Sequence, residues 1–97
     1  MTPAHHLLPG VLAAMIRQQP LSPAKVAFAW RAAAGAAVAR ATRTELREDG
    51  VLLVLVDDPR WRREIEPALP MLRPRLATLL GDVVRWIEVR DTSSQDD

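Results

Sequence analysis

The segment GVLLVLVDDPRW, residues 50–61, places the strongest constraint on how this chain can fold. Val51–Val56 is an unbroken apolar run bounded by turn-forming residues, which is typical of a β-strand that is apolar on both faces. Asp58 and Pro59 are the preferred cap and first residue of a helix, so Trp61 is expected in the first turn of that helix. The fold must therefore cover both faces of this strand or leave one apolar face in solvent.

A second strand is expected just before this run. Thr42, Thr44 and Leu46 alternate with charged residues, the pattern of a half-buried strand. Asp49-Gly50 between the two runs is a strong signal for a short hairpin. If Leu46 faces the core, the hairpin register divides the second strand into two faces. The core-facing residues are then Leu52, Val54 and Val56, and the outward-facing residues are Val51, Leu53 and Leu55.

Two helices are expected before the hairpin. The first lies within Leu7–Gln18, and the second begins at Pro23 with Ser22 as its cap. In the second helix Trp30 is interpreted as a core anchor, and Gly35 as a point where another backbone approaches closely. The expected buried face of this helix comprises Val26, Trp30, Ala33, Ala34, Ala37 and Val38.

A third helical region and a last strand follow the hairpin. Three prolines between residues 67 and 74 interrupt a helical period of leucines. Proline lacks a backbone donor and disrupts the turn before it. We therefore expect a helix at residues 59–66, a break, and a second helix at residues 70–80. Residues 83–90, VVRWIEVR, are expected to form the final strand.

The element order α-α-β-β-α-β predicts an α+β domain in which helices pack on a three-stranded sheet. A chain of 97 residues has room for one such domain, assigned to residues 1–90. Residues 91–97, DTSSQDD, are acidic and polar, and we expect them to form a disordered tail.

The sequence lacks the residues that several kinds of catalytic and binding site require. The chain has no cysteine, which excludes disulfides and thiolate sites and suits a reducing compartment. Its four glycines stand apart, so there is no phosphate-binding loop. His5 and His6 are more typical of a solvated segment than of a metal site, and helix capping explains Asp57 and Asp58. We predict no cofactor, no metal and no enzymatic activity.

Targeting signals are also missing from the sequence. No apolar run approaches the roughly 20 residues needed to span a bilayer. The first residues, MTPAHHLLPG, lack the basic start and the apolar length of a signal peptide. A cytoplasmic protein without membrane contact is therefore expected.

The basic residues are almost all arginines. Lys25 is the one lysine among 13 basic residues. Without Asp91, Asp96 and Asp97 of the tail, the basic residues outnumber the acidic ones by four. Arginine suits bidentate phosphate contacts and stacking, so an anionic partner is one explanation. A bias toward arginine codons is the other.

The outward face of the sheet is the first candidate surface. Ile87 and Val89 of the last strand fit the core, which directs Trp86 and Arg90 to the other side. An exposed apolar patch there would indicate a partner interface. The alternative is that the first helix or the tail covers this face, because a strand buried on both sides gives the same apolar run. The predicted partner-binding set is Leu53, Leu55 and Trp86, bordered by Arg43, Arg47 and Arg90.

The arginines around Trp61 are the second candidate surface. A tryptophan flanked by arginines suits single-stranded DNA, because bases stack on the ring and guanidinium groups follow the phosphates. The alternative is a solvated helix with Trp61 packed against the sheet. The predicted nucleic-acid-binding set is Arg60, Trp61, Arg62, Arg63, Arg73 and Arg75.

The ordered set of motifs across residues 24–90 resembles one protein family. A W-x4-G helix is followed by a threonine-bearing strand, a D-G hairpin and a strand with the pattern V-L-x-V-x-V. A tryptophan then opens the next helix, and the last strand is rich in arginine. Together these motifs resemble the DciA family of bacterial replicative helicase loaders. The matching residues are Trp30, Gly35, Asp49, Gly50, Trp61 and Glu64.

The resemblance implies a KH-like domain that binds the replicative helicase and contacts single-stranded DNA during helicase loading, without an ATPase of its own. It leaves a homodimer open. The alternative is a nucleic-acid-binding or structural accessory domain that self-associates through its sheet and has no helicase partner.

The sequence also departs from the family pattern. Ala41 and Thr44 stand where the family often has histidine and proline, and Leu53 and Leu55 stand where it commonly has polar residues. Many members continue beyond the domain, whereas this sequence ends at Asp97, which places full loader activity in question. The G-x-x-G loop of RNA-binding KH domains is missing, so we expect no sequence-specific RNA binding by that route.

Overall fold

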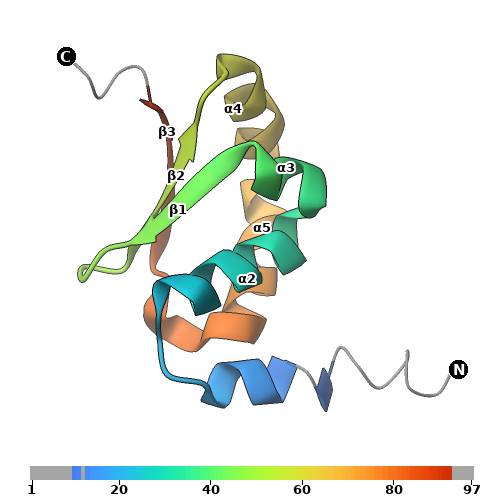
Figure 1. Ribbon diagram of the computed structural model, residues 1–97, viewed down its shortest axis with the longest axis vertical. Helices are drawn as coiled ribbons and strands as arrows, with labels where there is room; N and C mark the ends of the chain where they lie inside the picture. Colours follow the sequence, from blue (N-terminus) through green and yellow to red (C-terminus); the bar gives the residue numbers. More distant parts are fainter. Residues whose placement is uncertain (1–9, 12, 93–97) are drawn as a thin grey trace, which may run out of the picture.

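The computed structural model describes residues 10, 11 and 13–92 of the chain (Figure 1). The described residues between 10 and 18 are helical. The elements that follow are α2 (Pro23–Ala34), α3 (Ala36–Arg40), β1 (Thr42–Leu46), β2 (Val51–Val56), α4 (Pro59–Ile65), the 3-10 helix η1 (Glu66–Ala68), α5 (Leu69–Leu80), the 3-10 helix η2 (Gly81–Val83) and β3 (Trp86–Asp91). This order confirms the expected α+β class.

The strands form one mixed sheet in the order β1-β2-β3. β1 and β2 are antiparallel and pair Leu46 with Leu52, the predicted register. β3 lies parallel to β2 and pairs Ile87 with Leu52, so α4, η1 and α5 form the crossover between the two strands. Helices α2 to α5 gather on one face of the sheet, and the other face carries none of the described helices (Figure 1).

The hairpin turn uses the predicted glycine. The Gly50 N–H donates to the Arg47 carbonyl at 3.0 Å, and the Arg47 N–H donates to the Val51 carbonyl at 2.9 Å. Gly50 has φ of 90°, which L-residues rarely adopt, as in turns that end on a left-handed residue. Asp49 accepts the Val51 N–H at 3.1 Å and so stabilises the turn.

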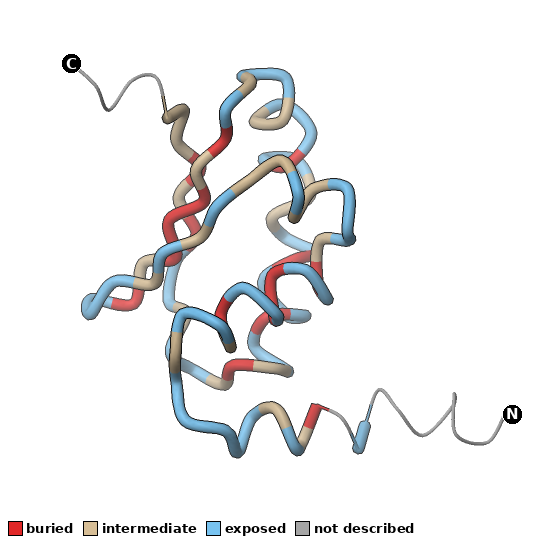
Figure 2. Tube along the Cα trace, in the orientation of Figure 1, coloured by how far each residue is buried: buried red, intermediate tan, exposed pale blue. Residues whose placement is uncertain are grey.

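One hydrophobic core fills the space between the sheet and the helices (Figure 2). Trp30 is 2% exposed, and its Nε1–H donates to Thr42 Oγ1 at 2.9 Å. The Thr42 hydroxyl in turn donates to the Val38 carbonyl at 2.8 Å. The indole is both buried and hydrogen-bonded, which confirms its role as core anchor. The core comprises Val26, Ala29, Trp30, Ala33, Leu52, Val54, Val56, Ile65, Leu72, Leu76, Leu80, Ile87 and Val89.

The interpretation of Gly35 as a point of close backbone approach is wrong. A Cβ atom placed on Gly35 would meet nothing within 4 Å. The residue instead has φ of 98° and ψ of 161°, a conformation almost restricted to glycine, and it separates α2 from α3. The break changes the helical phase, so Ala37 is exposed although the periodicity placed it on the buried face.

The third helical region breaks near the predicted position. Pro67 lies in η1, between α4 and α5. Pro70 lies in the first turn of α5, where no intrahelical donor is required. Pro74 lies inside α5, which continues past it to Leu80. One of the three prolines therefore coincides with the break, and the other two are accommodated.

The last strand begins and ends later than predicted. Residues 81–83 form η2, and β3 runs to Asp91. The Thr92 hydroxyl donates to the Val56 carbonyl at 3.1 Å and to the Asp57 carboxylate at 2.9 Å. Asp91 and Thr92 therefore belong to the folded domain and not to the tail. The prediction of disorder otherwise concerns residues 93–97, which lie outside the described residues.

Candidate functional site

Leu53 lies on the helix-free face of the sheet, as the register predicted, but it is not exposed. It stands between Glu45 of β1 and Glu88 of β3. Its exposure is 6%, although it lies outside the core cluster on the other face. Long charged side chains can cover apolar neighbours with their methylene groups, and Glu45 and Glu88 occupy the two positions beside Leu53. The expectation that Leu53 contributes an exposed apolar surface is wrong.

Leu55 and Trp86 lie at opposite ends of the same face. Leu55 is half-buried between Arg43 and Arg90, whereas Trp86 pairs with Val51 and is 57% exposed. Four residues of strand separate the two positions, a distance of about 13 Å. The predicted continuous patch of Leu53, Leu55 and Trp86 is therefore absent, and a single exposed indole remains.

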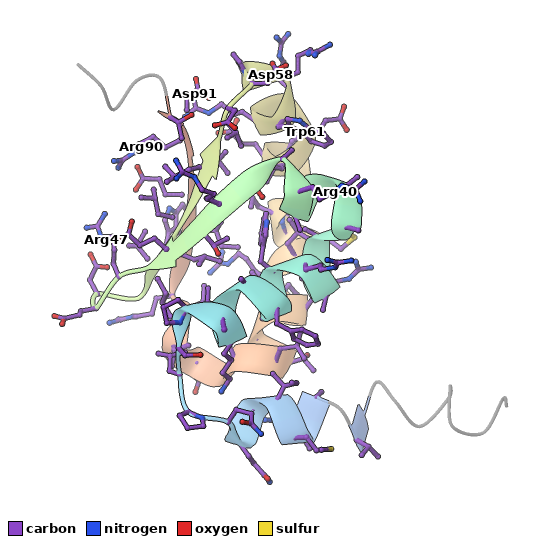
Figure 3. The ribbon with its side chains drawn as sticks, viewed as in Figure 1. Arg40, Arg47, Asp58, Trp61, Arg90 and Asp91 are labelled. Carbon is purple, nitrogen blue, oxygen red and sulfur yellow. The ribbon has the colours of Figure 1, made fainter. Side chains whose placement is uncertain are left out.

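The arginines that border this face are mostly engaged. Arg47 forms an ion pair with Asp49 at 2.9 Å, and Arg90 Nε donates to Glu88 at 3.1 Å. Figure 3 shows Arg47 and Arg90 on the side of the sheet away from the helices. Arg43 has no carboxylate within ion-pair distance among the described residues. The face is thus a mixed charged surface and not an apolar one.

Arg62 of the predicted nucleic-acid-binding set holds the fold together. Its Nη2 donates to the Val89 carbonyl of β3 at 2.7 Å. The same guanidinium lies 3.4 Å from the Glu66 carboxylate and 3.6 Å from the Asp91 carboxylate. It therefore joins α4 to β3, and its charge is already balanced by two acids.

Arg60 belongs to the cap of α4. Asp58 accepts a hydrogen bond from the Arg60 backbone N–H at 3.0 Å and one from its guanidinium at 2.9 Å. The side-chain hydrogen bond from Arg60 lowers the pKa of Asp58 below its ordinary value of 3.8, and the same contact raises the pKa of Arg60. The cap is therefore complete above that ordinary value and is lost as pH falls through the lowered pKa. Part of the Arg60 charge is neutralised locally.

Arg73 and Arg75 lie on α5, away from α4. Arg75 Nη1 donates to the Ala33 carbonyl in the last turn of α2 at 3.0 Å, a position where a cation is favourable. Arg73 Nη2 reaches the Arg85 carbonyl at 3.5 Å, and its guanidinium lies 5.3 Å from the centre of the Trp86 ring. The predicted set of six residues is therefore divided among three locations.

Trp61 contributes mainly to packing. Its side chain is half-buried and packs against the core cluster. Of its arginine neighbours on α4, Arg63 is exposed and makes no ion pair with any described residue. The structure of this region therefore matches the alternative interpretation, in which α4 is a solvated helix and Trp61 packs inward.

An aromatic and cationic cluster lies at the start of β3, and we call Trp86, Arg73 and Arg85 the Trp86 cluster. Trp86 is the exposed indole, and Arg73 stacks on it. The Arg85 backbone N–H donates to the Gly50 carbonyl at 2.8 Å, which ties the cluster to the hairpin. Sequence reasoning placed Trp86 and Arg73 in separate sets and omitted Arg85. The adjacent pair Arg85-Trp86 at the start of the strand was the available signal.

Metal and membrane sites are not found in the described residues. No three of their His, Asp or Glu side chains come together as a group that could hold a metal ion. His5 and His6 lie outside this part of the chain. None of the helices within it combines the length and the apolar character that a bilayer crossing requires.

Comparison with known proteins gives a family match that covers almost the whole domain. A family model described as Dna[CI] antecedent, DciA, matches residues 3–89, which extend from the N-terminal segment into β3. The chain belongs to the DciA family. No curated protein and no solved structure matches it.

The DciA match confirms the resemblance seen in the sequence, and the structure explains the motif residues physically. In this DciA domain Trp30 fills the core, Gly35 separates two helices and Gly50 closes the hairpin. Trp61 packs against the core. These four motif positions therefore maintain the fold, and the exposed indole of Trp86 lies outside the motif set.

Proposed function

We propose that this DciA-family domain is a non-enzymatic replication accessory protein that binds the replicative helicase and single-stranded DNA and so assists helicase loading. Membership of the DciA family, matched over residues 3–89, is the observation that carries the proposal. The family supports a role related to helicase loading. The particular partners and contacts are our proposal.

The Trp86 cluster is the proposed contact for single-stranded DNA. Its indole is 57% exposed, so a base can stack on the ring. Arg73 already lies over the ring, which places one cation where phosphates would pass, and the Arg85 side chain lies against Gly50 of the adjacent hairpin. Base–aromatic stacking contributes about 1–3 kcal/mol per base and does not depend on sequence. This chemistry suits a protein that must hold a strand without reading it.

Arg63 and Arg60 on α4 form a second, weaker candidate contact. Both are exposed, but Asp58 partly neutralises Arg60 and the neighbouring Trp61 is turned toward the core. This surface lacks an accessible ring for stacking. We therefore expect it to add electrostatic attraction only.

The helicase contact is proposed for the other end of the helix-free sheet face. Leu55 is half-buried there, and two arginines flank it: Arg43, which forms no ion pair with the other described residues, and the Glu88-bound Arg90. A half-buried leucine within a charged rim is the composition of a transient protein interface. Self-association through this face has less support, because Leu53 at its centre is already covered within one chain.

A pull-down against the replicative helicase tests the proposed function. The immobilised domain is expected to retain the purified helicase of the same organism. The double variant Arg43→Glu with Arg90→Glu is expected to retain less, and Arg17→Glu, outside this face, should behave as wild type. Failure of the wild-type domain to retain helicase over a range of salt concentrations would contradict the proposal.

Trp86→Ala is expected to weaken binding of labelled oligo-dT by about tenfold, because a stacking contact of about 1–3 kcal/mol is lost. Trp86→Phe should restore much of the affinity, and Arg63→Ala should cause a smaller loss together with a shallower dependence on salt. Fluorescence anisotropy over a salt series measures all three. Equal affinity for the wild type and Trp86→Ala would remove the Trp86 cluster from the DNA contact.

A further inference from the structure

The free edge of β1 presents a row of backbone groups that the sheet leaves open. The Arg47 N–H donates to the Val51 carbonyl, and β1 pairs with β2 in the same register along its length. Hydrogen-bonded and non-hydrogen-bonded pairs alternate in an antiparallel ladder. Thr42, Thr44 and Leu46 therefore occupy the positions whose N–H and C=O groups point away from β2. These groups have the spacing that an added strand requires.

A groove runs beside this edge, between β1 and α2. One part, with a volume of about 480 Å³, is lined by residues that include Ala27, Trp30 and Thr42. A second part, of about 290 Å³, is lined by residues that include Leu21 and Leu46. Both parts have Pro23 and Thr44 in their lining, so they are neighbouring parts of the groove along the open edge. Alternate side chains of an added strand would enter it.

The two ends of the groove differ in charge. Arg31, Arg40 and Arg43 line the part near the start of β1. None of the three has a carboxylate within ion-pair distance among the described residues. Figure 3 shows Arg40 on the helical side of the molecule. The other part is lined by Val26 and further apolar residues, and Glu45 is its one charged residue.

The shape and chemistry of the groove favour a peptide over a nucleic acid. Single-strand binding grooves offer aromatic faces on which bases stack. Trp30 is the one aromatic residue that lines this groove, and at 2% exposure it presents no face. Backbone donors and acceptors beside alternating pockets are instead the features of strand addition.

We propose that the β1 edge binds an extended peptide segment of a protein partner, which adds as a fourth strand to the sheet. Acidic side chains of the segment meet Arg31 and Arg40, and β-branched apolar side chains enter the part lined by Leu21 and Leu46. The site is separate from the Trp86 cluster and shares Arg43 with the helicase face at Leu55. The proposal does not depend on the proposed function.

Labelled peptides of the sequences VTVTDSD and DSDTVTV serve as probes for the two strand directions, with lysine replacing aspartate in matched controls. One of the acidic peptides is expected to bind saturably, and its lysine control at least tenfold more weakly, because charge-assisted contacts are lost. Amide exchange should show new protection at Thr44 and Leu46 and no change at Arg43 and Glu45, which already face β2. Binding without this alternation would overturn the proposal.

Thr44→Pro removes one outward N–H without removing a bond to β2, since proline is tolerated at such edge positions. It is expected to weaken binding of the acidic peptide at least tenfold, and Thr44→Val, which keeps the N–H but changes one side chain of the groove, should lose much less affinity than Thr44→Pro. Arg31→Glu with Arg40→Glu should give a loss of similar size. Circular dichroism checks that each variant is folded. If Thr44→Pro does not fold, the amide-exchange pattern of the wild-type domain with bound peptide still tests the proposal.

Three outcomes would decide against the proposal. The first is displacement of the acidic peptide by oligo-dT, which would assign the groove to nucleic acid. The second is a concentration-dependent dimer that Thr44→Pro abolishes, which would assign the edge to a second copy of the chain. The third is the absence of binding by both acidic peptides at millimolar concentration.

Discussion

Trp30→Ala is expected to remove about 3–5 kcal/mol from the free energy of unfolding, the usual loss when a buried tryptophan is truncated to alanine. A domain of this size has about 5–15 kcal/mol in total, so the variant should be largely unfolded or only marginally folded. The indole is 2% exposed and lies in the core between the helices and the sheet. Its removal also leaves Thr42 Oγ1 without its donor.

Urea denaturation followed by far-UV circular dichroism measures this loss. Trp86→Ala is the matched control, since it removes the same side chain from a position that is 57% exposed. Trp30→Phe should recover part of the stability, because it keeps a ring in the cavity but loses the hydrogen bond to Thr42. If Trp30→Ala and Trp86→Ala had equal midpoints, the assignment of Trp30 as core anchor would fail.

Leu53→Glu is expected to destabilise the domain by about 3 kcal/mol at neutral pH. Burial of a leucine contributes about 1.5–3 kcal/mol, which the substitution forfeits. In addition the new carboxylate would stand directly between Glu45 and Glu88, and like charges opposite one another destabilise a sheet. Exposed apolar patches tolerate such a change, so the outcome separates a covered leucine from an exposed one.

Leu53→Gln and Leu53→Lys isolate the charge effect. The glutamine variant loses the same apolar contacts without a carboxylate, and the lysine variant places a cation between Glu45 and Glu88. Both are expected to be more stable than Leu53→Glu at pH 7. Repulsion is expected to raise the pKa of the carboxylate introduced at position 53 in the folded state, so its destabilising effect should decrease as pH falls toward the unfolded value of about 4.3. Chemical denaturation at pH 7 and pH 4.5 measures the difference in unfolding free energy between the glutamate and glutamine variants. Equal stability of these two variants at pH 7 would contradict the explanation.

Local chemistry made much of the fold predictable. Ser22 and Asp58 cap their helices with Pro23 and Pro59 in the first turn, as the sequence indicated. The Asp49-Gly50 turn sets the register of β1 and β2, and that register divides the faces of β2 correctly. These features depend on neighbours within a few residues, and the residue types alone report them.

The burial of Leu53 and the grouping of the arginines depend on tertiary contacts and could not be read from spacing. Leu53 is 6% exposed although it lies on the helix-free face between Glu45 and Glu88, which a pattern of apolar residues does not reveal. Arg62 and Arg75 appear as free charges in the sequence, yet each reaches a backbone carbonyl 27 or 42 residues away. Gly35 could have been read as a helix end, but its alanine-rich surroundings favour an unbroken helix.

The parallel pairing of β2 with β3 affects how the chain acquires its structure during synthesis. The β1–β2 hairpin joins neighbouring residues and can form as soon as both strands leave the ribosome. Every β2–β3 pair instead joins residues 35 positions apart, and β3 is the last strand in the described part of the chain. Contacts between distant residues form slowly, because the intervening chain must be ordered first. The nascent domain therefore exposes one side of β2 until β3 has been synthesised.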